Sequence, residues 1–352
     1  MTETTATTAN LDLSGLPRLE VEPVAGKRVL VRVDFNVPLG DDGSITDDTR
    51  IRAAIVTIEW LRAREATVIL MSHLGRPEGT RNEAFSLRPV ADRLGELLGQ
   101  PVTFLDDCVG GETRASVLRA NPGDVVLLEN TRFHAGEAAN DPDFARQLAQ
   151  LGELFVNDAF GTAHRANAST EGVAHYLPSF PGFLMERELH QLAPLVNDEV
   201  SRPYVAIIGG AKVADKIGVL RTLVVACDSI LVGGAMANTF HAARGTEMAA
   251  SKVEGEDGQQ LAREIMRAAD EHDCSLLLPI DVKAADAFSE DADVAEVPVE
   301  DIPDGWMALD IGPRTAVMYR QRVEGAHTLF WNGPMGVFEM EPFASGTLAV
   351  AD

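Results

Sequence analysis

The sequence predicts an α/β protein of two doubly wound, Rossmann-like lobes, each a parallel sheet covered by helices on both faces. The chain has 352 residues, above the roughly 250–300 residues at which single cores usually divide. Short apolar runs of strand length alternate with longer amphipathic runs of helical length through both halves. Glycines or polar residues directly follow most of the apolar runs. These positions would be the carboxyl ends of parallel strands, where open α/β sheets bind their ligands.

The composition argues against several classes of function. The formal net charge is −24, which disfavours nucleic acid and anionic membrane surfaces as partners. No apolar run is long enough to span a membrane, and residues 1–10 lack the charged and apolar regions of a signal peptide. The three cysteines are scattered, so no disulfide framework is expected. Only five of the 30 basic residues are lysine. We therefore expect a cytoplasmic protein with a salt-adapted, halophilic surface, and an ordinary acidic surface is the alternative.

The first half shows five apolar runs that predict strands, at residues 28–34, 67–71, 102–105, 125–128 and 154–156. One helix is expected to begin near Thr49, because Ile51, Ile55 and Ile58 repeat with helical spacing. Two more are expected at 87–98 and 144–151. This alternation predicts the first parallel sheet.

The ends of these predicted strands carry the basic residues of the first half. The polar residues that follow the strands are Asp34, Asn36, His73, Arg76, Arg132, Asn157, Asp158 and Arg165, and Arg50 lies at the start of the first helix. Because these ends share one edge of a parallel sheet, we expect a cationic pocket there. Arginine suits bidentate capture of phosphate and carboxylate groups. The alternative is that each arginine pairs with a nearby acidic side chain.

Metal and nucleophile chemistry are poorly supported by the motifs. His73, His134 and His164 fit no compact metal-ligand spacing, and we expect no protein-bound metal. No G-x-S-x-G sequence is present, and Cys108 lacks a nucleophile motif.

A lobe boundary is predicted near the middle of the chain. The segment PSFPG at 178–182 interrupts the alternating pattern, an amphipathic helix is expected at 183–196, and 197–203 is polar. We therefore expect an N-terminal lobe at 1–182, a hinge helix at 183–200 and a C-terminal lobe at 201–352.

The second half begins with an anion-site pattern. Residues 205–208 form an apolar run that predicts a buried strand, Gly209 and Gly210 end it, and a helix is expected from Ala211. Lys212 and Lys216 are four residues apart and would share one helical face. A helix N-terminus with two lysines would bind phosphate or carboxylate. The alternative is an ordinary turn with solvated lysines, since neither the Walker A nor the G-x-G-x-x-G pattern is present.

Glycines follow the other predicted strands of this half, which we expect at 229–232, 276–278, 307–311 and 328–331, with a helix at 261–269. Such glycines let a flat ligand or a phosphate approach the backbone. Trp331 could stack on a base or lie in the core. Glu339 could accept a hydrogen bond from a ribose hydroxyl or remain solvated. Two anion sites in two lobes indicate phosphoryl transfer between a small acid and a nucleotide.

Eight motifs in order resemble the phosphoglycerate kinase family, over residues 27 to 347. They are VRVDFNVP at 31–38, DDTRI at 47–51, SHLGRP at 72–77, LENTRFH at 128–134, VNDAFGTAHRA at 156–166, GGAKVADKI at 209–217, DIGP at 310–313 and WNGPMGVFE at 331–339. The resemblance implies a monomeric, hinge-bending kinase that reversibly transfers the acyl phosphate of 1,3-bisphosphoglycerate to ADP with Mg²⁺, giving 3-phosphoglycerate and ATP.

The resemblance also implies the roles of individual residues. The acid would contact Asp34, Phe35, Asn36, Arg50, His73, Leu74, Gly75, Arg76, Arg132 and Arg165. The nucleotide would contact Lys212, Lys216, Gly233, Gly234, Gly312, Asn332 and Glu339. Arg50 and Lys212 would be the catalytic residues. No general base is needed, because the attacking group is already an anionic oxygen, so catalysis would be positioning and charge stabilisation.

The sequence departs from the family in one respect. The glycine-rich segments GGGD and STGGGA, which the family carries near its C-terminus, are absent from these residues. We therefore expect that the C-terminal end is truncated and the nucleotide lobe is incomplete. A non-catalytic phosphoglycerate-binding protein is the alternative if the chain is whole. A dehydrogenase is a weaker alternative, because the dinucleotide fingerprint is missing.

Overall fold

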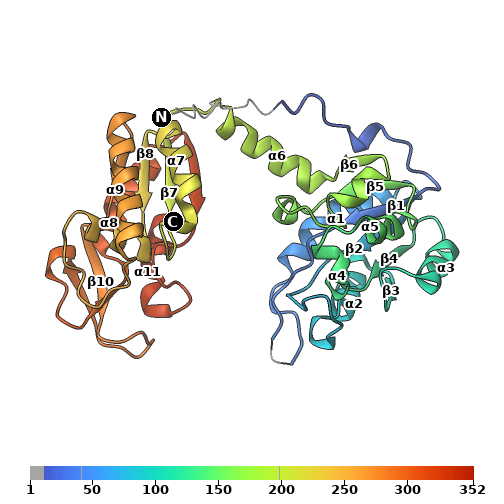
Figure 1. Ribbon diagram of the computed structural model, residues 1–352, viewed down its shortest axis with the longest axis horizontal. Helices are drawn as coiled ribbons and strands as arrows, with labels where there is room; N and C mark the ends of the chain where they lie inside the picture. Colours follow the sequence, from blue (N-terminus) through green and yellow to red (C-terminus); the bar gives the residue numbers. More distant parts are fainter. Residues whose placement is uncertain (1–11, 41, 198) are drawn as a thin grey trace. The chain divides into compact units, whose positions relative to one another are not determined.

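The computed structural model describes residues 12–40, 42–197 and 199–352. The predictions made for the N-terminal tail at 1–10 lie outside this range. The chain divides into two compact units, Met1–Ala193 and Pro194–Asp352, and Figure 1 draws the helices and strands of both. Among the described residues, we found no helix with the length and apolar content that crossing a membrane requires.

The first unit contains a six-stranded, fully parallel sheet in the order β3-β4-β2-β1-β5-β6. Its strands are β1 (Arg28–Arg32), β2 (Thr67–Met71), β3 (Thr103–Leu105), β4 (Val125–Leu128), β5 (Leu154–Asn157) and β6 (Ser179–Pro181). The five predicted strands all form. The sixth, β6, was not predicted, because it lies inside the proline-containing segment that we interpreted as a break. An edge strand tolerates proline because one side of it has no partner.

Helices cover both faces of this sheet, and the alternation of side chains along each strand explains why. Val29 and Val31 of β1 pack in one hydrophobic cluster, whereas Leu30 between them packs in another. The first cluster includes side chains of α1 (Thr49–Arg62) and α2 (Arg88–Leu98), and the second includes those of α3 (Gly111–Arg119) and α5 (Pro142–Ala149). Burial on both faces is what a continuous apolar run predicts for a parallel strand.

Helix α6 (Phe183–Val196) forms as predicted and begins on a buried carboxylate. One oxygen of Asp158 accepts hydrogen bonds from the backbone N–H groups of Leu184 (2.9 Å) and Met185 (3.1 Å). Asp158 therefore caps the helix, although we expected it to belong to the cationic pocket. The division between the two units falls inside α6, between Ala193 and Pro194.

The second unit is built on a four-stranded parallel sheet in the order β13-β7-β8-β9. Its strands are β7 (Tyr204–Ile208), β8 (Ser229–Val232), β9 (Ser275–Leu277) and β13 (Thr328–Asn332). Ala206 and Ile208 pack with α7 (Ile217–Ala226), α8 (Ala235–Ala243) and α9 (Glu256–Glu271). Val205 and Ile207 face the other way, toward α10 (Pro313–Glu324) and α11 (Ser345–Ala351). This sheet is therefore also covered on both faces.

A second, antiparallel sheet in this unit was not predicted. It has the order β11-β10-β12, with β10 (Asp281–Ala285), β11 (Val294–Pro298) and β12 (Met307–Ile311). The strand at 307–311 forms within the expected bounds, but our assignment of it to the parallel sheet was wrong. An apolar run indicates a strand, whereas its partner and direction depend on tertiary contacts.

The helix predicted from Ala211 begins later than expected. A short 3-10 turn covers Ala214–Lys216, and α7 begins at Ile217. The prediction that Lys212 and Lys216 share a face of one helix is therefore wrong. Tertiary hydrogen bonds hold the preceding residues out of the helix, because the Gly210 carbonyl accepts from the Met236 N–H (2.9 Å) and the Val213 N–H donates to Glu254.

Candidate functional site

A cationic site lies at the carboxyl edge of the first sheet, beyond β2, β4 and β5. A cavity of about 600 Å³ is lined by Arg76, Arg132 and Arg165. Burial and the neighbouring charge of Arg165 lower the pKa of Arg132. The structure thus brings together three of the predicted arginines, and their positive charges would favour a small anion in the cavity.

A network of hydrogen bonds organises this site around Gly75. Its N–H donates to the Asn36 side-chain oxygen (2.8 Å), and its carbonyl accepts from the Arg132 guanidinium (2.8 Å). Arg50 instead pairs with Asp34 at 2.6 Å between nitrogen and oxygen. The alternative reading, in which every arginine pairs with an acid, therefore describes Arg50 but not Arg132.

Two of the predicted acid-binding residues point into the protein. Phe35 and Leu74 are buried in the hydrophobic core of the first unit. Only their backbone groups could face a ligand, and the Phe35 N–H already donates to the Ser72 hydroxyl (2.9 Å).

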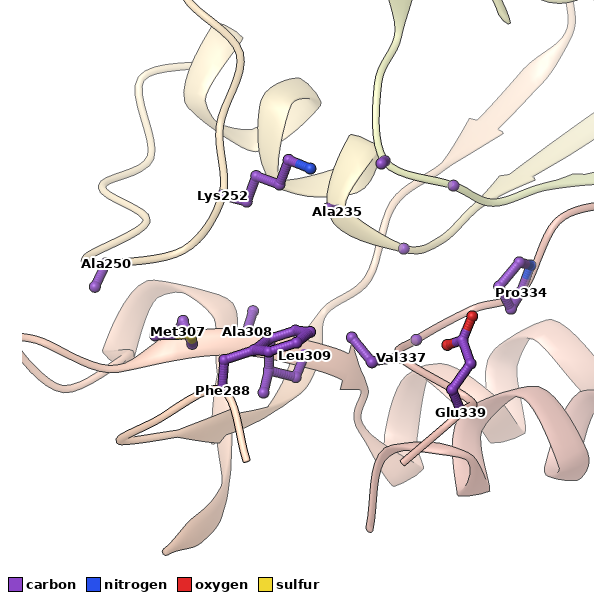
Figure 2. A pocket seen from close by; sticks show the side chains of 14 residues that line it. Ala235, Ala250, Lys252, Phe288, Met307, Ala308, Leu309, Pro334, Val337 and Glu339 are labelled. Carbon is purple, nitrogen blue, oxygen red and sulfur yellow. The ribbon is translucent and has the colours of Figure 1, made fainter. Parts of the chain in front are cut away.

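A second site is a pocket of about 450 Å³ in the second unit. Figure 2 shows Met307, Leu309 and Phe288 on one side of it and Ala235 with Lys252 on the other. Gly210, Gly234 and Glu339 are also among the lining residues. Apolar side chains face glycine backbone across this pocket, which suits the binding of a flat ring.

The loops that follow β7, β8 and β13 are hydrogen-bonded to one another around this pocket. The Gly209 N–H donates to the Asn332 carbonyl (3.0 Å), and the Gly234 N–H donates to the Met335 carbonyl (2.7 Å). A Cβ atom at Gly233 would lie 2.6 Å from the sulfur of Met335. The predicted glycines are therefore needed for loop packing as well as for space in the pocket.

The remaining predicted nucleotide residues fall into three locations. Lys216 donates to the side chain and the backbone carbonyl of Asn332, and burial lowers its pKa. Lys212 is exposed on the loop between β7 and the 3-10 turn. Gly312 lies against the Asp281 carboxylate at the start of α10 and is not among the residues that line the pocket. The nucleotide contact expected of Gly312 stays a prediction.

Comparison with known proteins decides which family contains these two sites. The family model described as phosphoglycerate kinase matches residues 19–352. The chain belongs to the phosphoglycerate kinase family. The resemblance drawn from the eight motifs is thus confirmed.

Related proteins agree with this assignment. A phosphoglycerate kinase of Chloroflexus aurantiacus is 56% identical over 329 residues, which span 93% of this chain and 82% of that protein. One of Moorella thermoacetica is 57% identical over 325 residues, or 92% and 82% of the two chains. The solved structure from Coxiella burnetii has a TM-score of 0.81 at 39% identity and covers 96% of this chain and 84% of its own. That from Pyrococcus horikoshii has a TM-score of 0.84 at 33% identity, covering 95% and 84%.

Membership in the phosphoglycerate kinase family makes this chain a phosphotransferase, an ATP-binding kinase of glycolysis. The two-lobed α/β fold is likewise that of the solved phosphoglycerate kinases. The kinase function is thereby supported over the non-catalytic binding protein and over the dehydrogenase.

Several residues of this phosphoglycerate kinase site were missed by sequence reasoning. Arg32 is only 2% exposed and donates to Ser169 (2.8 Å), and its other nitrogens contact His73 and Val33. Its place in the VRVDFN motif, two residues before Asp34, was the available signal. Lys252 and Phe288 lie in segments without a recognisable motif, so only tertiary structure brings them to the pocket.

Trp331, left open between core and base stacking, packs in a hydrophobic cluster on the parallel sheet of the second unit. Its indole N–H donates to the Gly333 carbonyl (2.7 Å). Trp331 is partly buried, and this packing favours the core interpretation.

Three potential metal ligands, Asp107, Cys108 and His134, have donor atoms within 4.8 Å of one another. The Asp107 oxygen nearest His134 (2.7 Å) also accepts from the backbone N–H of Cys108 (2.6 Å). Hydrogen bonds thus account for this arrangement, and burial raises the pKa of the Cys108 thiol, which disfavours the thiolate that metals bind.

Asp310, in the motif DIGP, should make the stability of the fold depend on pH. Its carboxylate is 4% exposed and accepts from the N–H groups of Gly346 (2.7 Å) and Ile311 (2.9 Å). Burial nevertheless raises its pKa from 3.8 to about 6. The folded state then binds this proton more tightly than the unfolded state. The contribution of Asp310 to the free energy of unfolding should therefore fall as the pH rises from about 4 to about 6.

The measurement compares the native chain with Asp310→Asn by urea unfolding at several pH values. The native chain should lose stability relative to the variant as the pH rises through this window, by at most about 3 kcal/mol. A difference between the two proteins that does not change with pH would contradict the assignment.

Proposed function

We propose that this chain transfers the acyl phosphate of 1,3-bisphosphoglycerate to ADP, and the reverse, with the acid bound in the first unit and the nucleotide in the second. The observation that carries this proposal is the arginine-lined cavity at the carboxyl edge of the first sheet. In a chain of net charge −24, three arginines against one acidic lining residue, Glu78, favour a small, multiply charged anion.

The acid would be held by groups of different chemistry. Arg76, Arg132 and Arg165 would bind its phosphate and carboxylate oxygens, and His73 would donate a hydrogen bond. Asp34 and Asn36 would orient the acid by hydrogen bonds to its hydroxyl group. Asp34 also pairs with Arg50, and Asn36 accepts from the Gly75 N–H, so both hold other parts of the site in place. Arg50, about half exposed, is the residue of this unit that we propose to stabilise the transferred group.

The nucleotide would lie in the pocket of Figure 2. Its base would fit between the backbone at Gly234 and the apolar side chains opposite, and Glu339 would accept from the ribose. Lys216 and Asn332 would contact phosphate oxygens, with Gly233 supporting the loop behind Gly234. Lys212 would follow the phosphoryl group during transfer.

Magnesium is the cofactor that we propose to accompany the nucleotide. Among the described residues, the candidate metal cluster of three or more ligands is the Asp107 group of the first unit, not one beside the pocket. Mg²⁺ commonly binds through substrate phosphates with few protein ligands. The described residues do not form a complete magnesium site, so the chemistry above includes no step through the ion.

Four further assignments remain predictions. They are the lobe limits 1–182 and 201–352, the hinge role of 183–200 and the cytoplasmic location, which we inferred from the sequence, and the monomeric state, which the family resemblance implies.

Replacing Arg132 by alanine tests the acid site. The KM for 3-phosphoglycerate should rise by about ten- to hundredfold, because hydrogen bonds to charged groups contribute about 1.5–3 kcal/mol. The KM for ATP should stay within about twofold. The control is Arg119→Ala, since Arg119 is exposed on α3 and donates to Ser116 of the same helix (2.9 Å). An unchanged KM for the acid in Arg132→Ala would remove Arg132 from the site.

A further inference from the structure

Arg32 is a buried cation in contact with His73, a residue of the proposed acid site. It is the last residue of β1, and its side chain is among the largest that are almost fully buried. With 2% exposure, the guanidinium cannot itself bind a substrate from solution. Its Nε donates to the Ser169 hydroxyl (2.8 Å), one terminal nitrogen donates to the Val33 carbonyl, and the other lies 3.1 Å from Nδ1 of His73.

The contact between Arg32 and Nδ1 of His73 determines which imidazole nitrogen carries the hydrogen. A guanidinium has only donors, so Nδ1 of His73 must be the acceptor in this pair. An imidazole that accepts at Nδ1 and is neutral carries its hydrogen on Nε2. We propose that Arg32 is a positioning residue that holds His73 as the neutral Nε2–H tautomer, so that this N–H donates to the anionic acid.

The position of Arg32 is maintained by a second buried charge. Glu137 accepts from the backbone N–H (2.9 Å) and the hydroxyl (2.5 Å) of Ser169, and from the Thr131 hydroxyl (3.2 Å). Ser169 therefore connects Arg32 to Glu137. Burial lowers the pKa of Arg32, and the negative charge of Glu137 opposes this effect. Arg32 is thus held by Ser169, which Glu137 fixes in turn, and by the Val33 carbonyl, which leaves it little freedom to release His73.

The surroundings of His73 favour the same neutral state. Burial, followed by the positive charges of Arg32, Arg132, Arg165 and Arg50, lowers the pKa of His73 to about 2. Among the described residues, Nε2 of His73 has no hydrogen-bond partner, whereas Nδ1 has Arg32. The proposed function supplies the missing acceptor, an oxygen of the bound acid, and this inference depends on that function.

The first experiment uses the native chain and no activity. Two-bond nitrogen–proton NMR spectra at pH 7 report the tautomer of each histidine, and His73→Ala identifies the signals of His73 by their loss. We expect the Nε2–H tautomer of a neutral ring, with and without 3-phosphoglycerate. An Nδ1–H tautomer or an imidazolium ring would overturn the inference, even if every variant at position 32 failed to fold.

The second experiment separates positioning through His73 from a structural role. The dissociation constant of 3-phosphoglycerate is measured for Arg32→Lys, His73→Ala and the double variant, with the native circular dichroism spectrum required of each. Arg32→Lys should weaken binding about tenfold in the native background, because lysine keeps the charge but cannot make all three contacts. In the His73→Ala background the same change should alter binding by less than about twofold.

The outcomes distinguish the inference from the function on which it depends. Equal losses from Arg32→Lys in both backgrounds would mean that Arg32 does not act through His73, and the acid site would stand. If His73→Ala leaves acid binding unchanged, the placement of His73 in the proposed acid site fails first.

Discussion

Replacing Lys212 by alanine should lower kcat by about two to three orders of magnitude, the usual loss when one group that stabilises transition-state charge is removed. Lys212 is exposed on the loop after β7, and within the described part of the chain it forms no hydrogen bond or ion pair. Its ammonium group is therefore available to a moving phosphoryl group. Because this contact would strengthen in the transition state, the dissociation constant of 3-phosphoglycerate should change by less than about threefold.

Lys27, a lysine of the first unit, offers a matched control for Lys212. Lys27→Ala removes a lysine of the first unit that pairs with Glu22 at 2.9 Å, and its kcat should remain within about twofold of the native value. Steady-state kinetics and direct acid binding are measured on both variants. If kcat and acid affinity fell by the same factor in Lys212→Ala, the proposed role in transfer would be wrong.

Replacing Gly209 by alanine should destabilise the second unit by about 3 kcal/mol or more, because a rigid steric conflict would be created. The added Cβ atom would lie 1.8 Å from the carbonyl oxygen of Pro334, which is backbone and cannot rotate away. To relieve this conflict, the loops after β7 and β13 would have to separate. The separation would also break the hydrogen bond from the Gly209 N–H to the Asn332 carbonyl (3.0 Å). Nucleotide affinity should fall with stability, since the same loops form the pocket.

Gly218 offers the control for this substitution. It is exposed near the start of α7, and nothing lies within 4 Å of the Cβ atom that alanine would add. Gly218→Ala should stabilise the chain by up to about 1 kcal/mol, because alanine loses less backbone entropy in a helix. Urea unfolding and ADP binding are compared for the two variants. A Gly209→Ala protein as stable as the native chain would show that the loops can separate without loss.

The strands and their ligand-bearing ends could be predicted from sequence because their signals are local. A run such as 125–128 is too short for a buried helix, and the residues after it, including Arg132, must emerge at the carboxyl edge if the sheet is parallel. The cationic cavity at this edge contains Arg76, Arg132 and Arg165, all named beforehand. The helix α6 was predictable for the same reason, since its amphipathic repeat is contained within its own length.

The errors concern residues whose conformation depends on distant partners. Lys212 lies in a loop and not on a helix because Gly210 and Val213 form hydrogen bonds with Met236 at the start of α8 and with Glu254, both distant in sequence. Asp158 is a polar residue that follows a strand, as a ligand-binding residue would be, but it is buried and caps α6.

Periodicity and motif order are properties of the chain itself, and they determine the α/β class, most strands and the family. Which strand pairs with β10, which glycines support a loop, and which buried charge lies behind His73 depend on side chains that are far apart in sequence. Those choices are made by packing and by the need of buried polar groups for partners. Tertiary structure alone therefore decided that Arg32 contacts His73 and that β12 pairs with β10.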